Sequence, residues 1–364
     1  MANLRADMSP ADGARIAVPD GWVEVDPGPD VATTQVVTLA DWDATPGLRP
    51  TMTVVATPSG PHGVASRVLA EAQANLSEVL VVSIDPWRLP DSAALGRRLV
   101  FAHTDGDLTL STLAWAIGTA GGDVVVTAHA ESTELHRYDA AFAQAVAGIS
   151  LPGAAATPTH PDASADLARQ VRSGPWDEVA PTPRAPRTAI VADPDARILV
   201  EASVGGATHR FDATLVGGQA TVSATCSPRA SSQAADVPGS PPATYRVPVS
   251  RLALAVAQWL GLGPARTPSG AAATIPISVV MRRLLDPTVP APDGVDRAAW
   301  SEPWFLWTLR SSATDSGLVM VDTGTSGQCA VMETDDERTT RFAPLSSYNV
   351  WLTLNWLISE SRVA

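Results

Sequence analysis

The stretch Ile16-Ala17-Val18-Pro19-Asp20-Gly21-Trp22 opens a module of strands and helices that closes at Leu151. Apolar residues at helical spacing from Ala65 to Leu80 predict one long amphipathic helix in this module. A second helix is predicted by the spacing of Leu135, Tyr138, Phe142, Val146 and Ile149. Segments rich in β-branched and apolar residues predict strands at 36–39, 51–57, 81–87, 97–103, 108–117 and 123–129.

Turn signals show how these strands connect. Asp105-Gly106-Asp107 and Gly121-Gly122-Asp123 each separate two predicted strands, and such residues tolerate the left-handed backbone of a hairpin turn. Because short strands follow one another through turns, we expect an antiparallel α+β sandwich rather than repeated βαβ units.

Beyond Leu151 the composition shifts to Ala, Pro, Thr and Asp, and seven prolines between 152 and 186 oppose both helix and sheet. We interpret 153–187 as a linker in which Trp176 docks onto a neighbouring domain. Later strands are predicted at 198–204, 208–216, 219–226, 304–309, 318–323 and 328–333, while 275–285 fits strand, helix or both in turn. Ser250 is expected to cap a helix that Gly261 ends, and Ser346 or Ser347 to cap the last helix.

These patterns predict an α+β protein of two domains, with antiparallel sheets packed against long amphipathic helices. The expected bounds are 1–152 for the first domain, 153–187 for the linker and 188–364 for the second domain. A chain of 364 residues with 45% hydrophobic residues is long and apolar enough for two cores.

Charge excludes several functions. The net charge of −13 argues against nucleic acid, since phosphate binding needs clustered basic groups. All 25 basic residues are arginine, so Schiff-base chemistry, a Walker-type phosphate lysine and a lysine general base are excluded.

The two cysteines, Cys226 and Cys329, are too few for a disulfide framework, and we expect both thiols to be buried or half-buried. The first ten residues are polar and do not resemble a secretory signal, and no run reaches the roughly 18 apolar residues of a membrane span. A cytoplasmic protein without a membrane span is therefore expected.

Residues that carry chemistry are scattered. No histidine has another His, a Cys or a Glu at metal-ligand spacing, so neither a metal nor another cofactor is expected. Ser326 in Gly324-Thr325-Ser326-Gly327 fits a hairpin loop rather than a nucleophile elbow. Arg97 and Arg98 point to opposite faces of a strand and do not form one clamp. We therefore expect no enzymatic activity.

Tryptophans are the stronger signal. Trp304 and Leu306 share one face of a predicted strand, whereas Phe305 and Trp307 share the other, so one face requires a partner or another domain. Trp356 falls off the apolar line of the last helix. The candidate partner-binding residues are Trp87, Trp115, Trp304, Trp307 and Trp356.

The first module resembles the PsbP-like α+β domain of LpqN-type proteins. The resemblance rests on Val18-Pro19-Asp20-Gly21-Trp22, residues 48–55, Gly96-Arg97-Arg98-Leu99-Val100-Phe101 and the closing segment 141–151. It covers about 135 residues and implies an actinobacterial sheet-and-helix module. LpqN-type members are usually lipoproteins, and this sequence shows no lipobox. A similar fold also serves as a chaperone for effectors in type VI secretion.

The second half resembles, over shorter stretches, the EspG family of type VII secretion chaperones. The matching residues are Tyr245-Arg246-Val247-Pro248 before the helix 252–263, then 318–323 with Gly327, and Phe342-Ala343-Pro344 before the last helix. EspG proteins have two such halves, whereas here the PsbP-like module replaces the first. The resemblance implies recognition of small helical secretion substrates.

Two hypotheses about function follow. The first is a non-enzymatic cytoplasmic chaperone or adaptor that binds a helical protein client of a type VII-like secretion system by apolar burial. The alternative is a small-ligand or lipid-binding module that uses the concavity of the N-terminal sheet near Trp87 and Trp115. A hydrolase ranks third, because Ser, His and Asp would have to come together from distant loops. The sequence leaves the oligomeric state open.

Overall fold

The computed structural model describes residues 13–28, 33–42, 48–58, 63–88, 95–119, 122–151, 195–204, 206–229, 242–314 and 316–363. Two antiparallel sheets with helices give the expected α+β class. The chain divides into two compact units, one of Met1–Asp105 with Thr109–Leu167 and one of Gly106–Leu108 with Ala168–Ala364. The predicted linker 153–187, with Trp176, lies outside the described residues, so the predicted domain bounds stay predictions.

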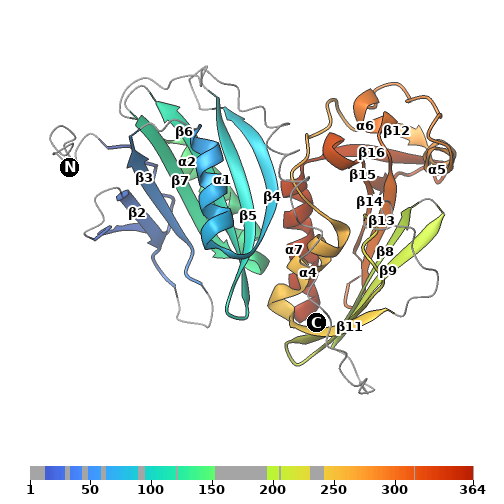
Figure 1. Ribbon diagram of the computed structural model, residues 1–364, viewed down its shortest axis with the longest axis horizontal. Helices are drawn as coiled ribbons and strands as arrows, with labels where there is room; N and C mark the ends of the chain where they lie inside the picture. The colour runs from blue at the N-terminus through green and yellow to red at the C-terminus, as the bar shows by residue number, and fades with distance from the viewer. Residues whose placement is uncertain are drawn as a thin grey trace. The chain divides into compact units, whose positions relative to one another are not determined.

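The first unit contains a seven-stranded sheet in the order β1-β2-β3-β7-β6-β5-β4 (Figure 1). At the turn between β5 and β6, Gly106 has φ +55°, which confirms the predicted hairpin. The strands are β1 (Trp22–Val25), β2 (Thr33–Leu39), β3 (Thr51–Thr57), β4 (Ser77–Arg88), β5 (Leu95–Asp105), β6 (Leu108–Thr119) and β7 (Gly122–Glu131); the helices are α1 (Val64–Asn75), the short η2 (Ser132–Glu134) and α2 (Leu135–Ala147).

The opening motif joins the sheet to α2. Trp22 is buried, and its ring meets Tyr138 and Phe142 of α2 edge to face, at centroid distances of 6.5 and 5.7 Å. Gly21 precedes it with φ +78°, a conformation that costs a glycine little. This turn directs Trp22 into the core, where its ring packs on α2 and joins the start of the sheet to that helix.

The first predicted helix is wrong at its C-terminal end. The apolar spacing extends to Leu80, but α1 ends at Asn75 and β4 begins at Ser77. Leu76 is already extended, with φ −94° and ψ 141°, and the run after it pairs with β5 from Ser77, with a shift of register before Leu80. The apolar residues at 79–82 fit both the spacing of a helix and that of a strand. Pairing with the neighbouring strand β5 decides for the strand.

The second unit contains a nine-stranded sheet in the order β11-β10-β9-β8-β13-β14-β15-β16-β12 (Figure 1). The type and place of each predicted strand are confirmed, whereas β11 and β16 were not expected. The strands are β8 (Ala196–Val204), β9 (Ala207–Val216), β10 (Gln219–Ala224), β11 (Ala243–Pro248), β12 (Ala273–Pro276), β13 (Phe305–Ser311), β14 (Gly317–Asp322), β15 (Gln328–Glu333) and β16 (Thr339–Leu345).

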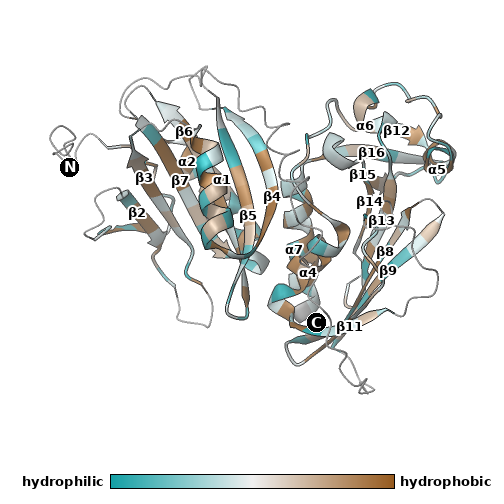
Figure 2. Cartoon of the chain, in the orientation of Figure 1, coloured by the Kyte–Doolittle hydropathy of each residue, from teal (hydrophilic) through white to brown (hydrophobic). Residues whose placement is uncertain are grey.

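Helices α4 (Leu252–Leu260) and α7 (Ser347–Val363) cover one face of this sheet, and Figure 2 shows hydrophobic residues along them and along β13. Ser311 at the end of β13 meets Ser361 of α7 at 2.7 Å, so the face of β13 that carries Phe305, Trp307 and Leu309 lies under α7. All three of these side chains are buried. Among the described residues, no helix is long and apolar enough to cross a membrane.

The opposite face is covered by α5 (Ile277–Leu285) and the short α6 (Arg297–Ser301). Leu306 and Trp304 pack there against a buried cluster that includes Val321 and Phe342. The second apolar face of β13 is therefore partly covered by residues of the same unit, and the expected contact of this face with a partner or another domain stays a prediction. Segment 275–285 is strand and helix in turn, since β12 ends at Pro276 and α5 begins at the next residue.

Two capping expectations have different outcomes. Ser250 does not cap α4: it lies in the 3-10 turn η5 (Val249–Arg251), and Arg251 takes the capping position without a side-chain hydrogen bond. Ser346 does cap α7, because its hydroxyl accepts from the amide of Asn349 at 3.1 Å. Gly261 ends α4 with φ +66°, as expected.

Candidate functional site

The clearest unpartnered apolar feature of the second unit is one side of α5. Ile277, Met281 and Leu285 are 40%, 53% and 82% exposed. They are spaced four residues apart, so they form a single ridge along the helix. We call these three residues the α5 ridge. Large apolar side chains at this exposure and spacing are typical of a surface that binds another protein.

The other side of α5 is fixed to the core. Val280 is buried in the cluster with Ile275, Val289 and Trp300. Arg282 and Arg283 lie in the last turn, where positive charge favours the helix dipole. After the helix, the Asp286 carboxylate accepts from the amide and hydroxyl of Thr288 at 2.9 and 2.6 Å, and these bonds lower the pKa of Asp286. The ridge therefore sits on a helix with a defined end.

Arg283 joins α5 to the segment that follows α6. It is 2% exposed, and its guanidinium donates to the carbonyl of Trp300 at 2.9 and 2.6 Å and to that of Glu302 at 2.8 Å. Burial lowers the pKa of Arg283, yet an arginine stays protonated at neutral pH. Because the three bonds come from one planar group, the position of α5 on the sheet is set by Arg283.

An aromatic cluster of Trp300, Trp304 and Phe342 lies beneath α5. Trp304 stacks on Phe342 at 5.6 Å with an interplanar angle of 14°, and it meets Trp300 edge to face at 4.6 Å. Both indole N–H groups donate to backbone carbonyls, Trp300 to Val289 and Trp304 to Ala299. Their polar atoms are thereby satisfied inside the fold.

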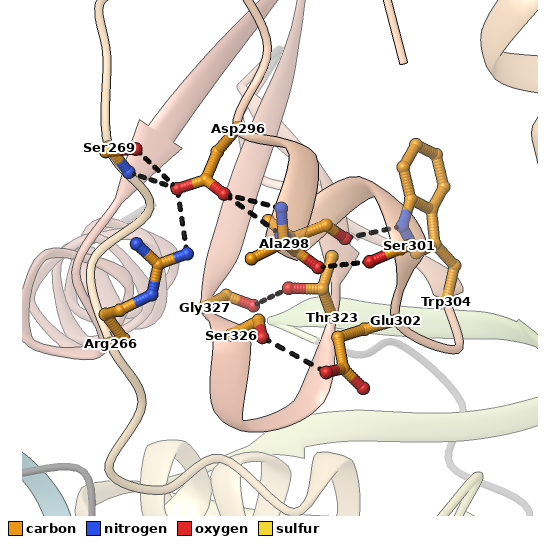
Figure 3. A network of polar contacts seen from close by, with 11 residues as sticks. Arg266, Ser269, Asp296, Ala298, Ser301, Glu302, Trp304, Thr323, Ser326 and Gly327 are labelled. Atoms are coloured by element: carbon orange, nitrogen blue, oxygen red, sulfur yellow. Dashed lines mark hydrogen bonds and ion pairs between the residues drawn. The ribbon is translucent and has the colours of Figure 1, made fainter. Parts of the chain in front are cut away.

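Asp296 holds the same segment from the other side (Figure 3). Its carboxylate caps α6 by accepting from the amides of Ala298 and Ala299, and it also accepts from Ser269 and from Arg266 at 2.8 Å. Burial alone would raise the pKa of Asp296, but these hydrogen bonds outweigh it and hold the pKa well below its usual range. We call these contacts of Asp296 the Asp296 clasp. We interpret the clasp as structural, because each of these polar contacts joins residues of the same unit.

A recess beside this clasp is too small for an organic ligand. It is lined by Asp296, Ala299, Cys329 and Phe342 among others, and its cavity volume is about 10 Å³, space for a single water molecule. Cys329 in this lining is 1% exposed, and burial raises the pKa of its thiol to about 12. The buried state expected for Cys329 is confirmed, whereas Cys226 is exposed because it lies beyond the end of β10.

The five candidate tryptophans do not form one surface. Trp115 and Trp307 are 2% and 1% exposed and belong to the cores of their units, so in this fold they present no surface to a partner. Trp87 and Trp304 are half-buried. Trp356 is 37% exposed on α7, off the buried line of that helix as its spacing indicated. Binding of a partner or a small ligand by any of them stays a prediction.

Sequence reasoning missed the α5 ridge. The segment 277–285 has helical periodicity, but its two arginines suggest that the side with Arg283 faces solvent, whereas Arg283 is buried. A usable signal was present in the apolar residues at positions 277, 281 and 285, which recur every four residues. Recognising which side faces solvent required knowing that Val280 and Arg283 are buried.

A chain of polar contacts crosses the sheet of the first unit. The Thr112 hydroxyl lies 3.1 Å from Nε2 of His103 and 2.9 Å from Nδ1 of His129. Burial and then the neighbouring His103 lower the pKa of His129 to about 4, and burial lowers the pKa of His103. The described residues contain no group of three or more His, Cys, Asp or Glu side chains that would hold a metal ion.

No protein-family model matches the chain, and no curated protein matches it. Among solved structures, it is similar to LpqN of Mycobacterium tuberculosis, a protein involved in cell envelope biogenesis, at 16% identity and a TM-score of 0.31; the match covers 38% of this chain and 82% of that one. It is also similar to PsbP (CyanoP) of Synechocystis sp. PCC 6803, at 13% identity and a TM-score of 0.30, covering 39% of this chain and 88% of that one. The expected likeness to LpqN and PsbP thus extends to fold alone, and the comparisons do not support a likeness to EspG.

Proposed function

We propose that this protein is a non-enzymatic adaptor that binds an apolar helix of another protein along the α5 ridge. The observation that carries the proposal is the ridge itself, above all Leu285, which is 82% exposed. The ridge is not needed for the packing of α5, since Val280 and Arg283 already fix the other side of the helix. Removing three neighbouring apolar side chains from water by a partner is favourable.

The shape and charge of α5 indicate the chemistry of the partner. Residues four apart form a ridge that fits the groove between similar ridges of a second helix, with axes crossing at roughly −50°. Residues 277–285 contain two arginines and no acidic residue, although the whole chain is acidic. Arg282 is exposed beside Met281. The proposed partner is therefore an amphipathic helix whose apolar side is flanked by carboxylates.

The partner expected from the sequence is a helical client of a secretion system, bound in the cytoplasm. Such a client fits the proposed partner chemistry when its helix carries acidic residues. We keep it as the proposed biological setting. The mode of recognition would be helix against helix, in which a few apolar anchors supply most of the binding energy.

Site-specific photo-crosslinking in the native host tests the proposal. A photoreactive phenylalanine replaces Met281 or Leu285 in turn, and a matched control replaces Val216, which is 39% exposed on β9 of the same unit. We expect positions 281 and 285 to crosslink to one amphipathic helix of one other protein, identified by mass spectrometry, and position 216 not to do so.

A binding measurement with the identified protein completes the test. Leu285→Glu is expected to weaken its binding at least tenfold, because burying a leucine is worth about 1.5–3 kcal/mol, while Val216→Glu leaves binding unchanged. Circular dichroism of both variants establishes that the fold is kept. Crosslinks only to a second copy of this chain, no crosslink from 281 and 285, or unchanged binding by Leu285→Glu would each contradict the proposal.

A further inference from the structure

A cysteine and a histidine lie opposite each other at one end of the sheet in the second unit. The last pair of the β9–β10 ladder joins Phe211 to Ala224, and two residues further on the same register brings His209 opposite Cys226. The Thr225 amide still donates to the Arg210 carbonyl at 2.9 Å, so the pairing continues to this point. Nδ1 of His209 lies 3.5 Å from the Cys226 sulfur.

A second contact decides which atom carries the proton. Nδ1 of His209 also lies 3.2 Å from the backbone carbonyl of Cys226. A carbonyl oxygen only accepts hydrogen bonds, so this contact favours the tautomer with the hydrogen on Nδ1. The single Nδ1–H is then shared between the carbonyl oxygen and the sulfur, and towards the sulfur it acts as a donor. This geometry favours the thiolate of Cys226, because a thiolate accepts a hydrogen bond better than a thiol does.

The surroundings hold this geometry in place and leave the sulfur accessible. His209 is 3% exposed, and the carbonyl of Thr225, next to Cys226, accepts from the indole of Trp259 at 2.9 Å. Cys226 itself is exposed, whereas Cys329 is buried. A fixed donor beneath a solvent-exposed sulfur is the environment in which a cysteine becomes reactive.

We infer that Cys226 is a modification site that reacts with small disulfides such as oxidised glutathione. The Cys226 thiolate attacks one sulfur of the disulfide, a new sulfur–sulfur bond forms to Cys226, and the original bond breaks. The second half leaves as a thiolate and takes a proton from solvent. His209 acts as a positioning residue that donates to the sulfur. This inference is independent of the proposed binding by α5.

The test measures how fast Cys226 in the folded protein reacts with iodoacetamide across pH 6–10, and with oxidised glutathione at pH 7. His209→Asn keeps an N–H donor near the position of Nδ1, whereas His209→Leu removes it. Cys226→Ser identifies the labelled site by mass spectrometry, and Cys329→Ala serves as the matched cysteine control. Near-ultraviolet circular dichroism confirms that each variant is folded.

We expect one rapidly modified cysteine in the wild type and in Cys329→Ala, and none in Cys226→Ser. The midpoint of the alkylation profile should be about one pH unit lower in the wild type than in His209→Leu, with His209→Asn between them. A midpoint one pH unit lower raises the thiolate fraction at pH 7 roughly eightfold. The less basic thiolate is also a weaker nucleophile, which lowers the rate about threefold. The wild type should therefore react at pH 7 roughly threefold faster than His209→Leu. Equal profiles for the wild type and His209→Leu, or a Cys226 midpoint at the ordinary value of about 8.5, would overturn the inference. If His209→Leu does not fold, the alkylation midpoint of Cys226 in the wild type decides, and a value of about 8.5 or higher overturns the inference.

Discussion

The guanidinium of Arg283 lies 4.8 Å from the ring centroid of Trp304, while its N–H groups donate to the backbone carbonyls of Trp300 and Glu302. One side chain thus connects α5, the end of α6 and the start of β13. Since α5 carries the proposed binding ridge, this contact links the packing of the second unit to its proposed function.

Arg283→Ala is expected to lower the free energy of unfolding by about 2–4 kcal/mol, because it leaves buried carbonyls without donors and removes packing against Trp304. Urea denaturation followed by tryptophan fluorescence measures the change. Arg282→Ala is the matched control, since Arg282 is the exposed neighbour and its loss should change stability by less than about 0.5 kcal/mol. Equal effects of the two substitutions would show that Arg283 does not hold α5 in place.

Asp296→Ala should destabilise the protein by about 1–3 kcal/mol at pH 7, through loss of the α6 cap and of the contacts with Ser269 and Arg266. The pKa of Asp296 is lowered in the folded state, so its stabilisation is complete above the unfolded value of about 4 and is lost as the pH falls below it. The difference between wild type and variant in urea denaturation should therefore narrow as the pH falls from 4 to 2. A difference that stays constant over this range would contradict the assigned role of the charge.

The helices and strands that local patterns define were predictable from the sequence. Paired glycines, such as Gly217 and Gly218 with φ of +55° and +79°, mark a hairpin whatever surrounds them. Gly261 ends α4 for the same local reason. The boundary between α1 and β4 was not predictable, because the run after Leu76 fits two periods and only pairing with β5 selects the strand.

The candidate site was less predictable than the fold. Tryptophans were singled out by residue type, yet type does not separate the buried Trp307 from the exposed Trp356. The contact between His209 and Cys226 joins residues 17 positions apart and depends on strand register, which local sequence patterns do not specify. Exposure and register arise from tertiary packing, and both are needed to locate a site.

His129, which lies beside His103 in the sheet of the first unit, predicts a loss of stability in mild acid. The pKa of His129 is about 4 in the folded state because burial and then His103 disfavour its charge, whereas an unfolded histidine has a pKa of about 6.5. As the pH falls, His129 is therefore protonated in the unfolded chain before it is protonated in the folded protein. The free energy of unfolding is unaffected by His129 above about pH 6.5 and decreases as the pH falls towards 4. Protonation of His129 lowers it by up to about 3 kcal/mol. His129→Asn keeps a polar group near Thr112 and removes the titration. Urea denaturation at pH 7, 6, 5 and 4.5 should give a flatter curve for the variant, and an unchanged slope would contradict this assignment.

Gln328 on β15 predicts a substitution that stabilises the protein. Its side chain is 1% exposed, and neither its amide nitrogen nor its amide oxygen has a hydrogen-bond partner. A buried amide without partners carries the full cost of leaving water, so a side chain of similar volume without polar atoms should be favoured. Gln328→Met is expected to raise the free energy of unfolding by about 1 kcal/mol or more, whereas Gln328→Ala, which leaves a cavity, gains less or loses stability. Thermal and urea denaturation of the two variants measure the difference. A lower stability for Gln328→Met would mean that the amide binds a buried water molecule or makes bonds that the methionine cannot replace.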